Sequence, residues 1–436
     1  MTPATQQHLE AKNNDWLSKV PNGWHRTWIK FECIEGAQYG LNTSTNSYSD
    51  RGVRFLRTTD IDDYGKLNND FPAVFIPLDL AKDYLLKTGD VLFSRSGTIG
   101  KSYLHTDDTA PHAFAGYLVR FRPQKTLLSS FLLYVSQSHF IQTQIQSESL
   151  TSTISNFSGE KYENLEFLLP PLSAQHKIVA YLDRKAKTID DLVNQHLQHL
   201  KLLEEHRSSL IYTALTKGLN PHVKLKPSGI EYITEIPVHW SISSIREAYS
   251  CTLGKMLQNN PRHQKDVLVP YLKSQHVQWS GITGDLPKMW ASPQDLEQYE
   301  LLRGDVLICE GGNIGRATYL EMDLPGTIIQ NAVHRLRSPI NSGRFLFFQM
   351  SLIHSSGWLD VLCNKATIAH LTKEKLEQIY IPLPPPKEQR ELVAFIDREM
   401  IKIDKLCTEI KKILKTLKEY RQVLITNVVT GRLNIQ

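Results

Sequence analysis

Two stretches of this sequence repeat each other, and together they decide the fold. Residues 169–220 read LPPLSAQHKIVAYLDRKAKTIDDLVNQHLQHLKLLEEHRSSLIYTALTKGLN, and residues 383–434 read LPPPKEQRELVAFIDREMIKIDKLCTEIKKILKTLKEYRQVLITNVVTGRLN. When they are aligned without a gap, about 20 of roughly 50 positions are identical, which is far above chance. The chain of 436 residues therefore contains two copies of one unit.

Each repeated stretch has the pattern of one long amphipathic helix. Prolines at 170–171 and 384–386 end a preceding strand, and no Pro or Gly interrupts 173–217 or 387–430. Each helix is predicted to run for about 43 residues, or roughly 65 Å. Apolar residues recur in steps of three and four, as in a coiled-coil seam. The predicted seam contains Leu182, Ile189, Leu192, Leu203 and Leu210 in the first copy, and Ile396, Ile403, Leu406, Ile410, Ile413, Leu417 and Leu424 in the second.

The two helices are expected to cover each other's apolar stripe. A rod of this length must bury its stripe against a partner, and the nearest partner is its own copy. We therefore predict an antiparallel pair related by a pseudo-twofold axis. The same symmetry predicts that residues 15–24 lie beside the end of the second helix near Leu433, because residues 231–240 follow the first helix in the same way.

The segments in front of the two helices also match each other, more weakly. LKTGDVL at 86–92 and LLRGDVL at 301–307 each precede a GxIG turn. Short apolar or alternating runs predict strands, and longer periodic runs predict helices at 131–145 and 345–362. The predicted fold is α+β with two mixed α/β globules at 20–168 and 236–382, helical spacers at 169–219 and 383–436, an N-terminal segment at 1–19 and a linker at 220–235.

Composition limits the class of protein. The 50 Lys and Arg residues exceed the 45 Asp and Glu residues by a net charge of +5, which permits nucleic-acid contact without requiring it. Five scattered cysteines predict neither a disulfide framework nor a zinc ribbon, and they fit a reducing cytoplasm. The first 20 residues lack the pattern of a secretion signal, and no apolar run approaches the roughly 18 residues of a membrane span.

No motif in the chain indicates an active site. The segment GTIGKS at 97–102 resembles the end of a nucleotide-binding P-loop, but Arg95 stands where that motif requires its first Gly. We therefore interpret this turn as structural. The HExxH, GxSxG and zinc-spaced Cys/His patterns are missing. His196, His199 and His206 lie on the predicted seam, and we interpret them as polar packing residues rather than metal ligands.

The diverged front segments suggest recognition of two different targets at a fixed separation. Arg commonly reads guanine and Asn or Gln reads adenine, while Lys, Ser and Thr more often hold phosphate. The pairs Arg57/Lys273 and Lys101/Arg316 are basic in both copies, and we expect them to clamp phosphates. The candidate DNA-contacting residues are Arg54, Arg57, Thr58, Thr59, Arg95 and Lys101 in the first front, and Arg262, Lys273, Ser274, Gln275, Asn313 and Arg316 in the second.

These motifs, taken in tandem, resemble the specificity subunit of type I restriction-modification systems. The likeness rests on the LPPLSAQHKIVAYLD and LPPPKEQRELVAFID openings, the helices after them and the GDVL…GxIG segments, and it covers essentially the whole chain. The resemblance implies a non-catalytic subunit whose two target-recognition domains each read half of a bipartite, asymmetric double-stranded DNA site. It also implies that the helices dock two methyltransferase subunits, which use S-adenosylmethionine to methylate adenine, and that motor-nuclease subunits join them. No cofactor or metal is expected on this chain itself.

The length of the helical rods is expected to set the length of the unread spacer. Half-sites read from one face of B-DNA lie about one turn, roughly 10 bp, apart. Two other classes stay open. A coiled-coil assembly module would fail to bind any duplex even with its partner subunits. A stand-alone nucleotide-dependent nuclease would show ATP-dependent turnover that Lys101→Ala abolishes.

Overall fold

The computed structural model describes residues 20–68, 71–107, 109–149, 156–363 and 370–435. The chain forms two compact units. Unit 1 comprises Met1–Leu197 with Ile410–Gln436, and unit 2 comprises Gln198–Glu409. Each unit holds one mixed α/β globule and a part of each of two long helices. The predicted fold class, two mixed α/β globules with long helices and an internal repeat, is confirmed.

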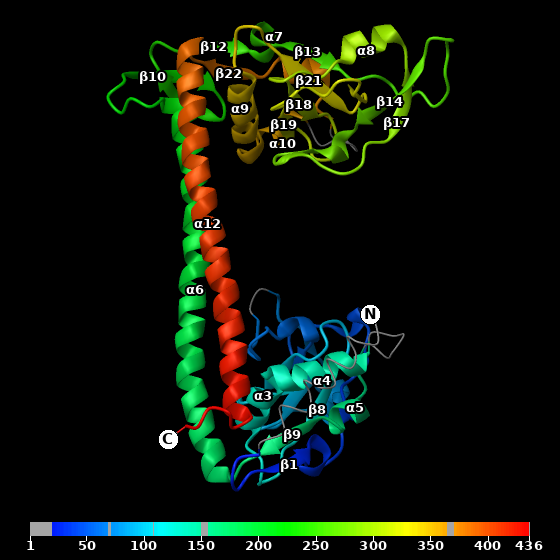
Figure 1. The fold of residues 1–436 in the computed structure, drawn as a ribbon, viewed down its shortest axis with the longest axis vertical. Helices are drawn as coiled ribbons and strands as arrows, with labels where there is room; N and C mark the ends of the chain where they lie inside the picture. Colours follow the sequence, from blue (N-terminus) through cyan, green and yellow to red (C-terminus); the bar gives the residue numbers. More distant parts are fainter. Residues whose placement is uncertain (1–19, 69–70, 108, 150–155, 364–369, 436) are drawn as a thin grey trace. The chain divides into compact units, whose positions relative to one another are not determined.

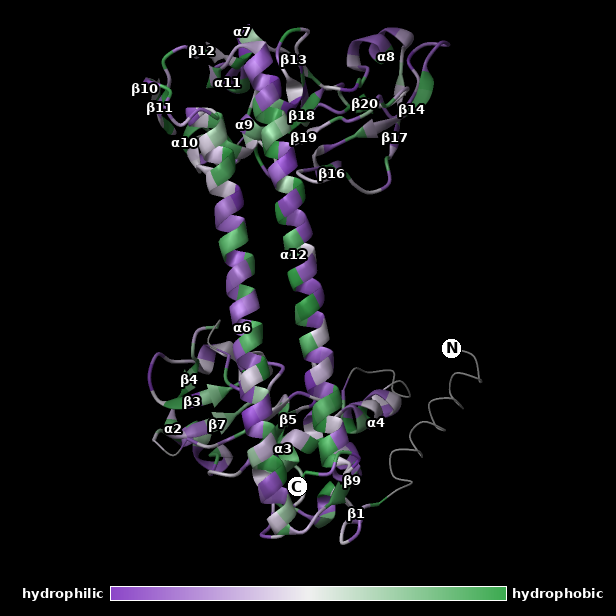
Figure 2. Ribbon diagram, turned by 60° about the vertical axis from the view of Figure 1, so that its left-hand side comes forward, coloured by the Kyte–Doolittle hydropathy of each residue, from purple (hydrophilic) through white to green (hydrophobic). Residues whose placement is uncertain are grey.

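The long helices begin and end close to the predicted residues (Figure 1). Helix α6 spans Leu172–Lys217 and helix α12 spans Pro386–Val429. A glycine in the left-handed region follows each of them, with φ of 72° at Gly218 and 69° at Gly431. Figure 2 shows that hydrophilic residues cover much of both helices, with apolar residues recurring along them. No helix in the described part of the chain is long and apolar enough to cross a bilayer.

The two helices pack against each other within each unit. In unit 1, Ile178 and Leu182 near the start of α6 share a hydrophobic cluster with Val428 near the end of α12. In unit 2, Leu215 near the end of α6 shares a cluster with Ile396 near the start of α12. The start of one helix therefore meets the end of the other, which is the predicted antiparallel arrangement.

The observed seam differs from the predicted one at alternate positions. Leu192, Leu406 and Ile413 were predicted to lie on it, but their side chains are 39%, 47% and 41% exposed. In each helix the prediction placed two steps of three in succession, over positions 186, 189 and 192 of α6 and positions 400, 403 and 406 of α12. The less exposed positions instead continue to alternate steps of four and three. The adjacent residues Val193, Cys407 and Leu414 are half-buried instead, and Leu200 and Arg207 likewise replace His199 and His206. Of the other predicted seam residues, Leu203, Leu210, Ile410 and Leu417 are half-buried, and Leu182, Ile189, Ile396, Ile403 and Leu424 are buried.

The globule of unit 1 is built on two small sheets. A four-stranded antiparallel sheet has the order β2-β8-β5-β6, and a three-stranded sheet has the order β4-β3-β7 with β3 and β7 parallel. The strands are β1 (His25–Trp28, paired with β9), β2 (Gln38–Tyr39), β3 (Val53–Leu56), β4 (Phe75–Ile76), β5 (Val91–Ser94), β6 (Ser102–Leu104), β7 (His112–Phe114), β8 (Leu118–Phe121) and β9 (Glu166–Leu169), and the helices are α2 (Leu78–Ala81), α3 (Ser129–Gln137), α4 (His139–Ser149) and α5 (Gly159–Glu163).

The globule of unit 2 repeats this topology. Its sheets have the orders β13-β21-β18-β19 and β17-β14-β20, again with one parallel pair, β14 and β20. The strands are β10 (Leu225–Ile230), β11 (Ile233–Pro237), β12 (Ser241–Ser244), β13 (Ser250–Leu253), β14 (Val267–Leu272), β15 (Val277–Gln278), β16 (Gly281–Ile282), β17 (Lys288–Ala291), β18 (Val306–Cys309), β19 (Ala317–Tyr319), β20 (Ile328–Ile329), β21 (Val333–Arg337) and β22 (Tyr380–Leu383), and the helices are α7 (Ile245–Ala248), α8 (Pro293–Tyr299), α9 (Gly343–Ser355), α10 (Trp358–Leu362) and α11 (Lys373–Glu377).

Three predicted segments are more finely divided than expected. The predicted helix at 131–145 is two helices, because Ser138 between α3 and α4 has extended backbone with ψ of 146°. The predicted helix at 345–362 is also two, and Gly357 with φ of 71° separates α9 from α10. The predicted linker at 220–235 contains most of an antiparallel hairpin, β10 with β11.

A buried glutamine fastens each long helix to its globule in the same way. Gln175 and Gln389 occupy aligned positions in the first turn of α6 and α12, and both side chains are completely buried. Gln175 Oε1 accepts from Leu128 N at 2.8 Å, while its Nε2 donates to Thr126 O and Pro170 O. This glutamine joins the helix start, the loop before α3 and the strand before α6 in one hydrogen-bonded knot.

A buried aspartate fastens the central strand in each globule. Asp90, before β5, binds Arg122 through two hydrogen bonds of 2.6 and 2.9 Å. Asp305, before β18, binds Arg337 in the same geometry at 2.6 and 2.7 Å. Both carboxylates are fully buried, and the bidentate pairing compensates for their lost hydration. The Asp of each GDVL motif thus links the start of one strand to the end of the neighbouring strand in the same sheet.

The described start of the chain lies beside the end of α12. Pro21 and Trp24 line a small cavity together with Leu433. Residues 15–19 of the predicted segment lie outside the described residues. In unit 2, Pro237 and Trp240 lie correspondingly close to Gly218 at the end of α6.

Candidate nucleic-acid interface

A groove in the first globule brings three of the predicted residues together. Arg57, Thr58 and Thr59 follow β3 and line a cavity of about 650 Å³. Its other walls are the loop 41–48 and the turn 115–117. The loop starts at Gly40, where a Cβ atom would lie 2.3 Å from a backbone carbonyl oxygen of the neighbouring strand. Only glycine permits so close an approach, so this residue fixes where the loop begins.

The guanidinium of Arg57 is held in place at this groove. Its Nη2 donates to Asp60 Oδ1 at 2.8 Å, and its Nε donates to Asp60 Oδ2 at 3.1 Å. The hydrogen bond with Asp60 raises the pKa of Arg57, so the group stays charged. Within the described part of the chain Nη1 has no hydrogen-bond partner, and the side chain is 26% exposed. The geometry suits one directed contact to an anionic or carbonyl oxygen.

Two other predicted residues of the first globule, Arg54 and Arg95, already have partners within the chain. Arg54 is turned inward with its side chain 13% exposed, and its Nη2 lies 3.6 Å from Asp60. Burial lowers the pKa of Arg54. Arg95 lies over the Tyr39 ring at 4.7 Å and donates to Asn156. DNA contact by Arg54 stays a prediction, and the free protein holds this side chain mostly buried beside Asp60.

The predicted phosphate clamp Lys101/Arg316 has the same internal role in both copies. Lys101 Nζ donates to Ile61 O at 2.9 Å, and Arg316 Nη2 donates to Ser274 O at 2.7 Å. Each bond ties the glycine-rich turn to the segment that follows the central strand of the smaller sheet. These bonds give the repeated basic residue a role in the fold, and its contact with phosphate stays a prediction.

The remaining candidates of the second globule have different surroundings. Ser274 Oγ donates to Ala332 O, and Asn313 Oδ1 is 2.8 Å from His354 Nε2. Lys273 is half-buried and Gln275 is exposed, both directly after β14. Arg262 is exposed on a loop that folds around Asp266. Hydrogen bonds, foremost the one from the Arg262 backbone N–H, lower the pKa of Asp266.

The loops after Gly40 and Gly254 differ most clearly in chemistry. Gly254 has the same close approach to a backbone carbonyl as Gly40, at 2.2 Å. Two residues after these glycines stand Asn42 in the first copy and Met256 in the second. The Met256 side chain is 74% exposed. Tyr117, 63% exposed in the wall of the first groove, is not among the predicted contact residues. The exchange of polar Asn42 for apolar Met256 at equivalent positions is the sequence signal that could have marked both loops as candidate contact regions.

No group of His, Cys, Asp and Glu residues that could hold a metal ion occurs in the part of the chain that the structure describes. The groove of the first globule offers directed hydrogen bonds and apolar contacts, which are the means by which proteins read the edges of bases.

Comparison with known proteins gives a consistent result. The sequence matches the family described as "Type I restriction modification DNA specificity domain" over residues 59–202 and 254–419. The type I restriction enzyme MjaX specificity subunit of Methanocaldococcus jannaschii is 23% identical over 96% of this chain and 96% of its own length. The EcoKI specificity subunit of Escherichia coli K12 is 21% identical over 96% of this chain and 91% of its own.

Two solved structures share the fold. A chain from a study of assembly and conformational transition in a type I restriction-modification system has a TM-score of 0.68 at 18% identity, over 95% of this chain and all of its own. The HsdS subunit of Thermoanaerobacter tengcongensis has a TM-score of 0.52 at 17% identity, over 95% of this chain and 98% of its own.

Proposed function

The chain belongs to the type I restriction-modification DNA specificity family, and we propose that each of its globules reads one half of a bipartite, asymmetric DNA site. As a specificity subunit it recognises DNA sequence within a complex and is not itself the catalyst. The observation that carries the two-half-site proposal is a pair of loops that leave equivalent glycines in the two globules and expose unlike side chains. Asn42 and Met256 follow glycines that make the same close backbone approach, so one scaffold presents different contacts.

The contacts proposed for DNA follow from exposure and geometry. Arg57, Thr58 and Thr59 in the first groove, with Asn42 and Tyr117, are the proposed readers of one half-site. Lys273 and Gln275 after β14, with Met256 and Arg262, are the proposed readers of the other. Met256 offers an apolar contact of the kind that suits a thymine methyl group.

The helices are proposed to dock two methyltransferase subunits. Leu192, Leu406 and Ile413 are apolar, lie off the observed seam and are exposed on α6 and α12. Docking a partner subunit over these side chains would remove their apolar area from water, which favours association. The partner subunits would bind S-adenosylmethionine and methylate adenine, and motor-nuclease subunits would join them for restriction, while this chain would hold no cofactor. The two unbroken helices would set the spacer between the half-sites.

Methylation mapping tests the proposal. Adenine methylation is mapped across host DNA with the gene present and with the gene deleted. We expect one discontinuous motif, two short specified parts around an unspecified spacer, to lose its methylation on deletion. Unchanged methylation at every motif would contradict the proposal and favour an assembly module that does not read DNA.

A further inference from the structure

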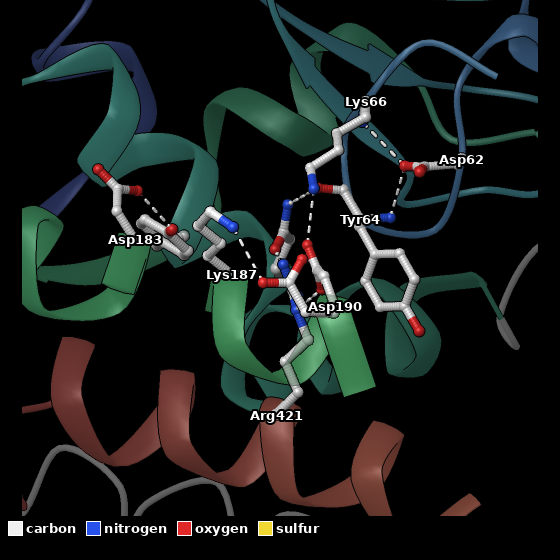
Figure 3. Close-up of polar contacts among 10 residues, drawn as sticks. Asp62, Tyr64, Lys66, Asp183, Lys187, Asp190 and Arg421 are labelled. Atoms are coloured by element: carbon white, nitrogen blue, oxygen red, sulfur yellow. Dashed lines mark hydrogen bonds and ion pairs between the residues drawn. The ribbon is translucent and has the colours of Figure 1, made fainter. Parts of the chain in front are cut away.

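A loop of the first globule, residues 61–67, lies against both long helices in unit 1 (Figure 3). Lys66 Nζ donates to Asp190 Oδ2 of α6 at 2.6 Å. Arg421 of α12 approaches the same carboxylate, with Nε 3.5 Å from Oδ1, and its guanidinium lies 4.6 Å from the centre of the Tyr64 ring. Lys418 of α12 also donates to Asp63 Oδ2 at 2.7 Å. The loop therefore contacts the two helices through a charge network and a cation–π pair.

Hydrogen bonds within the loop and from α3 hold its conformation. The Asp62 carboxylate accepts from the backbone N–H groups of Tyr64 and Lys66, both at 2.8 Å. Gly65 has φ of 80°, and a Cβ there would lie within 3.0 Å of neighbouring atoms. Gln137 of α3 donates to Tyr64 O at 3.0 Å and accepts from Arg421 at the same distance. A rigid loop of this kind loses little conformational entropy when it engages the helices.

The charged pair beneath the loop is common to both copies. Asp190 and Arg421 have side chains only 12% and 8% exposed. The aligned residues of the second copy, Asp404 and Arg207, also form an ion pair, within unit 2. The pair itself is therefore part of the repeated helical core, and it does not depend on the loop.

The loop contacts are present in the first copy alone. Counted without a gap from Arg57 and Lys273, the positions of Asp63 and Tyr64 hold Trp279 and Ser280. The loop of the second copy closes one residue earlier, since Val277 pairs with Ile282 where Ile61 pairs with Leu67. Glu204 stands where α12 has Lys418. In the described part of unit 2, no hydrogen bond or ion pair joins residues 277–283 to α6 or α12. The Trp279 ring instead contacts Phe347 and His354, with ring centres 5.7 and 5.3 Å apart.

The space beside the helices differs accordingly. In unit 2 a cavity of about 870 Å³ lies between this loop and the helices, lined by Trp279, Gly281, Arg207 and Asp404 among others. The corresponding cavity in unit 1, lined by Tyr64 and Arg421, measures about 270 Å³. The first globule is thus fastened to its helices at a place where the second is not.

We propose that Tyr64 and Lys66 are positioning residues, which hold the first globule in one orientation on the helix pair so that its half-site is read at one spacing. This inference rests on the proposed function. Neither residue belongs to the groove lined by Arg57 and Tyr117, so neither is expected to choose bases. The ion pairs involve exposed lysines, 63% exposed at Lys66 and 62% at Lys418, and salt therefore weakens the attachment.

The test uses the chain assembled with its methyltransferase subunits. Initial methylation rates are measured on a duplex with the mapped site and on duplexes whose spacer is one base pair longer or shorter. We expect the double variant Tyr64→Ala with Lys66→Ala to reduce the preference for the native spacer by roughly tenfold, with base preference unchanged. The conservative double variant Tyr64→Phe with Lys66→Arg is expected to keep the preference, and Ser280→Ala is the matched control in the second copy.

Hydrogen exchange of the unassembled chain provides an independent readout. Exchange of backbone amides in residues 61–67 should rise in the double alanine variant, and in the native chain at about 1 M salt, while residues 277–283 respond to neither change. Faster exchange with an unchanged spacer preference would show that the loop is only structural and would overturn the inference. Unchanged exchange would also overturn it. A native complex that methylates none of the duplexes would instead contradict the proposed function. The two failures are therefore distinguishable.

Discussion

Replacing Gln389 by alanine tests whether the glutamine shared by the two helix openings fastens the helix to its globule. Gln389 Oε1 accepts from Ser342 N, and Nε2 donates to Asn341 Oδ1 and Pro384 O, each at 2.9 Å. The side chain is completely buried, so the variant leaves three polar groups without partners and water does not replace the amide freely.

The expected loss follows from these three bonds. A hydrogen bond of this kind contributes about 1 kcal/mol net, and an orphaned buried group costs about 1–3 kcal/mol. Alanine recovers a few tenths of a kcal/mol through its helix propensity. Because the Asn341 side chain can turn to a new partner, we expect Gln389→Ala to lower the free energy of unfolding of unit 2 by about 3 kcal/mol.

Urea unfolding followed by hydrogen exchange of peptides from each unit measures this loss where it occurs. Gln389→Ala should lower the midpoint for unit 2, and Gln175→Ala should do the same for unit 1. Gln198→Ala, at an exposed position of α6, is the control and should change either free energy by no more than about 0.5 kcal/mol. A loss below about 1 kcal/mol for Gln389→Ala would refute the reasoning, because the hydrogen bonds would then not explain the shared glutamine.

Three further predictions concern spacing, base contact and pH. Deleting one heptad from both α6 and α12 should shorten the preferred spacer by about 3 bp without altering either half-site, since seven helical residues span about 10 Å; an unchanged spacer in methylation mapping would refute the proposed role of helix length. Tyr117→Ala should reduce affinity for the native duplex by roughly tenfold, measured by fluorescence anisotropy of the assembled complex, while the unfolding free energy stays within about 0.5 kcal/mol because the residue is 63% exposed; an equal loss on duplexes with a scrambled first half-site would count against base contact. Burial lowers the pKa of His334 below its usual 6.5, and its ring bonds Leu371 O at 2.9 Å. The His334 ring therefore binds a proton more readily in the unfolded chain than in the folded one, so its contribution to stability is present above pH 6.5 and is lost as pH falls toward the folded pKa. The urea midpoint of unit 2 should fall more between pH 7.5 and 5.5 in the native chain than in His334→Asn. Equal falls in the two chains would contradict the assignment of this pH dependence to His334.

The sequence predicted the helices well and their contact line less well, for a physical reason. Uninterrupted periodicity between prolines and glycines determines where a helix can run, and α6 and α12 follow it. Apolar or weakly polar residues stand side by side at Leu192–Val193 and Leu406–Cys407, so either member of each pair could have faced the partner. The choice depends on how the second helix crosses the first, which a single helix pattern does not contain.

The groove and the charged residues near it depended on contacts between distant parts of the chain. Arg54 and Lys101 are basic residues in front loops, and their pattern matched DNA contact. In the structure Arg54 lies beside Asp60 in an ion pair, and Lys101 donates a hydrogen bond to Ile61 O. Sequence periodicity cannot identify these partners. Tyr117 is the converse case, because nothing in its sequence context marked it as a contact residue, yet it lies exposed immediately before β8.

The duplication separates shared buried residues from divergent exposed residues within one molecule. Where the copies agree, as at Gln175 and Gln389 or Asp90 and Asp305, the shared residue is buried and fully hydrogen-bonded. Where they differ at equivalent places in the fold, as at Asn42 and Met256 after their glycines, the side chains are exposed. A residue needed to close the core had to be kept twice, since each globule folds around its own copy. A residue that reads a target gains from differing, because identical grooves would read a symmetric site. The loop at Tyr64 belongs with the second group, although it touches helices rather than a groove, and that departure is the reason to assign it to the placement of one globule.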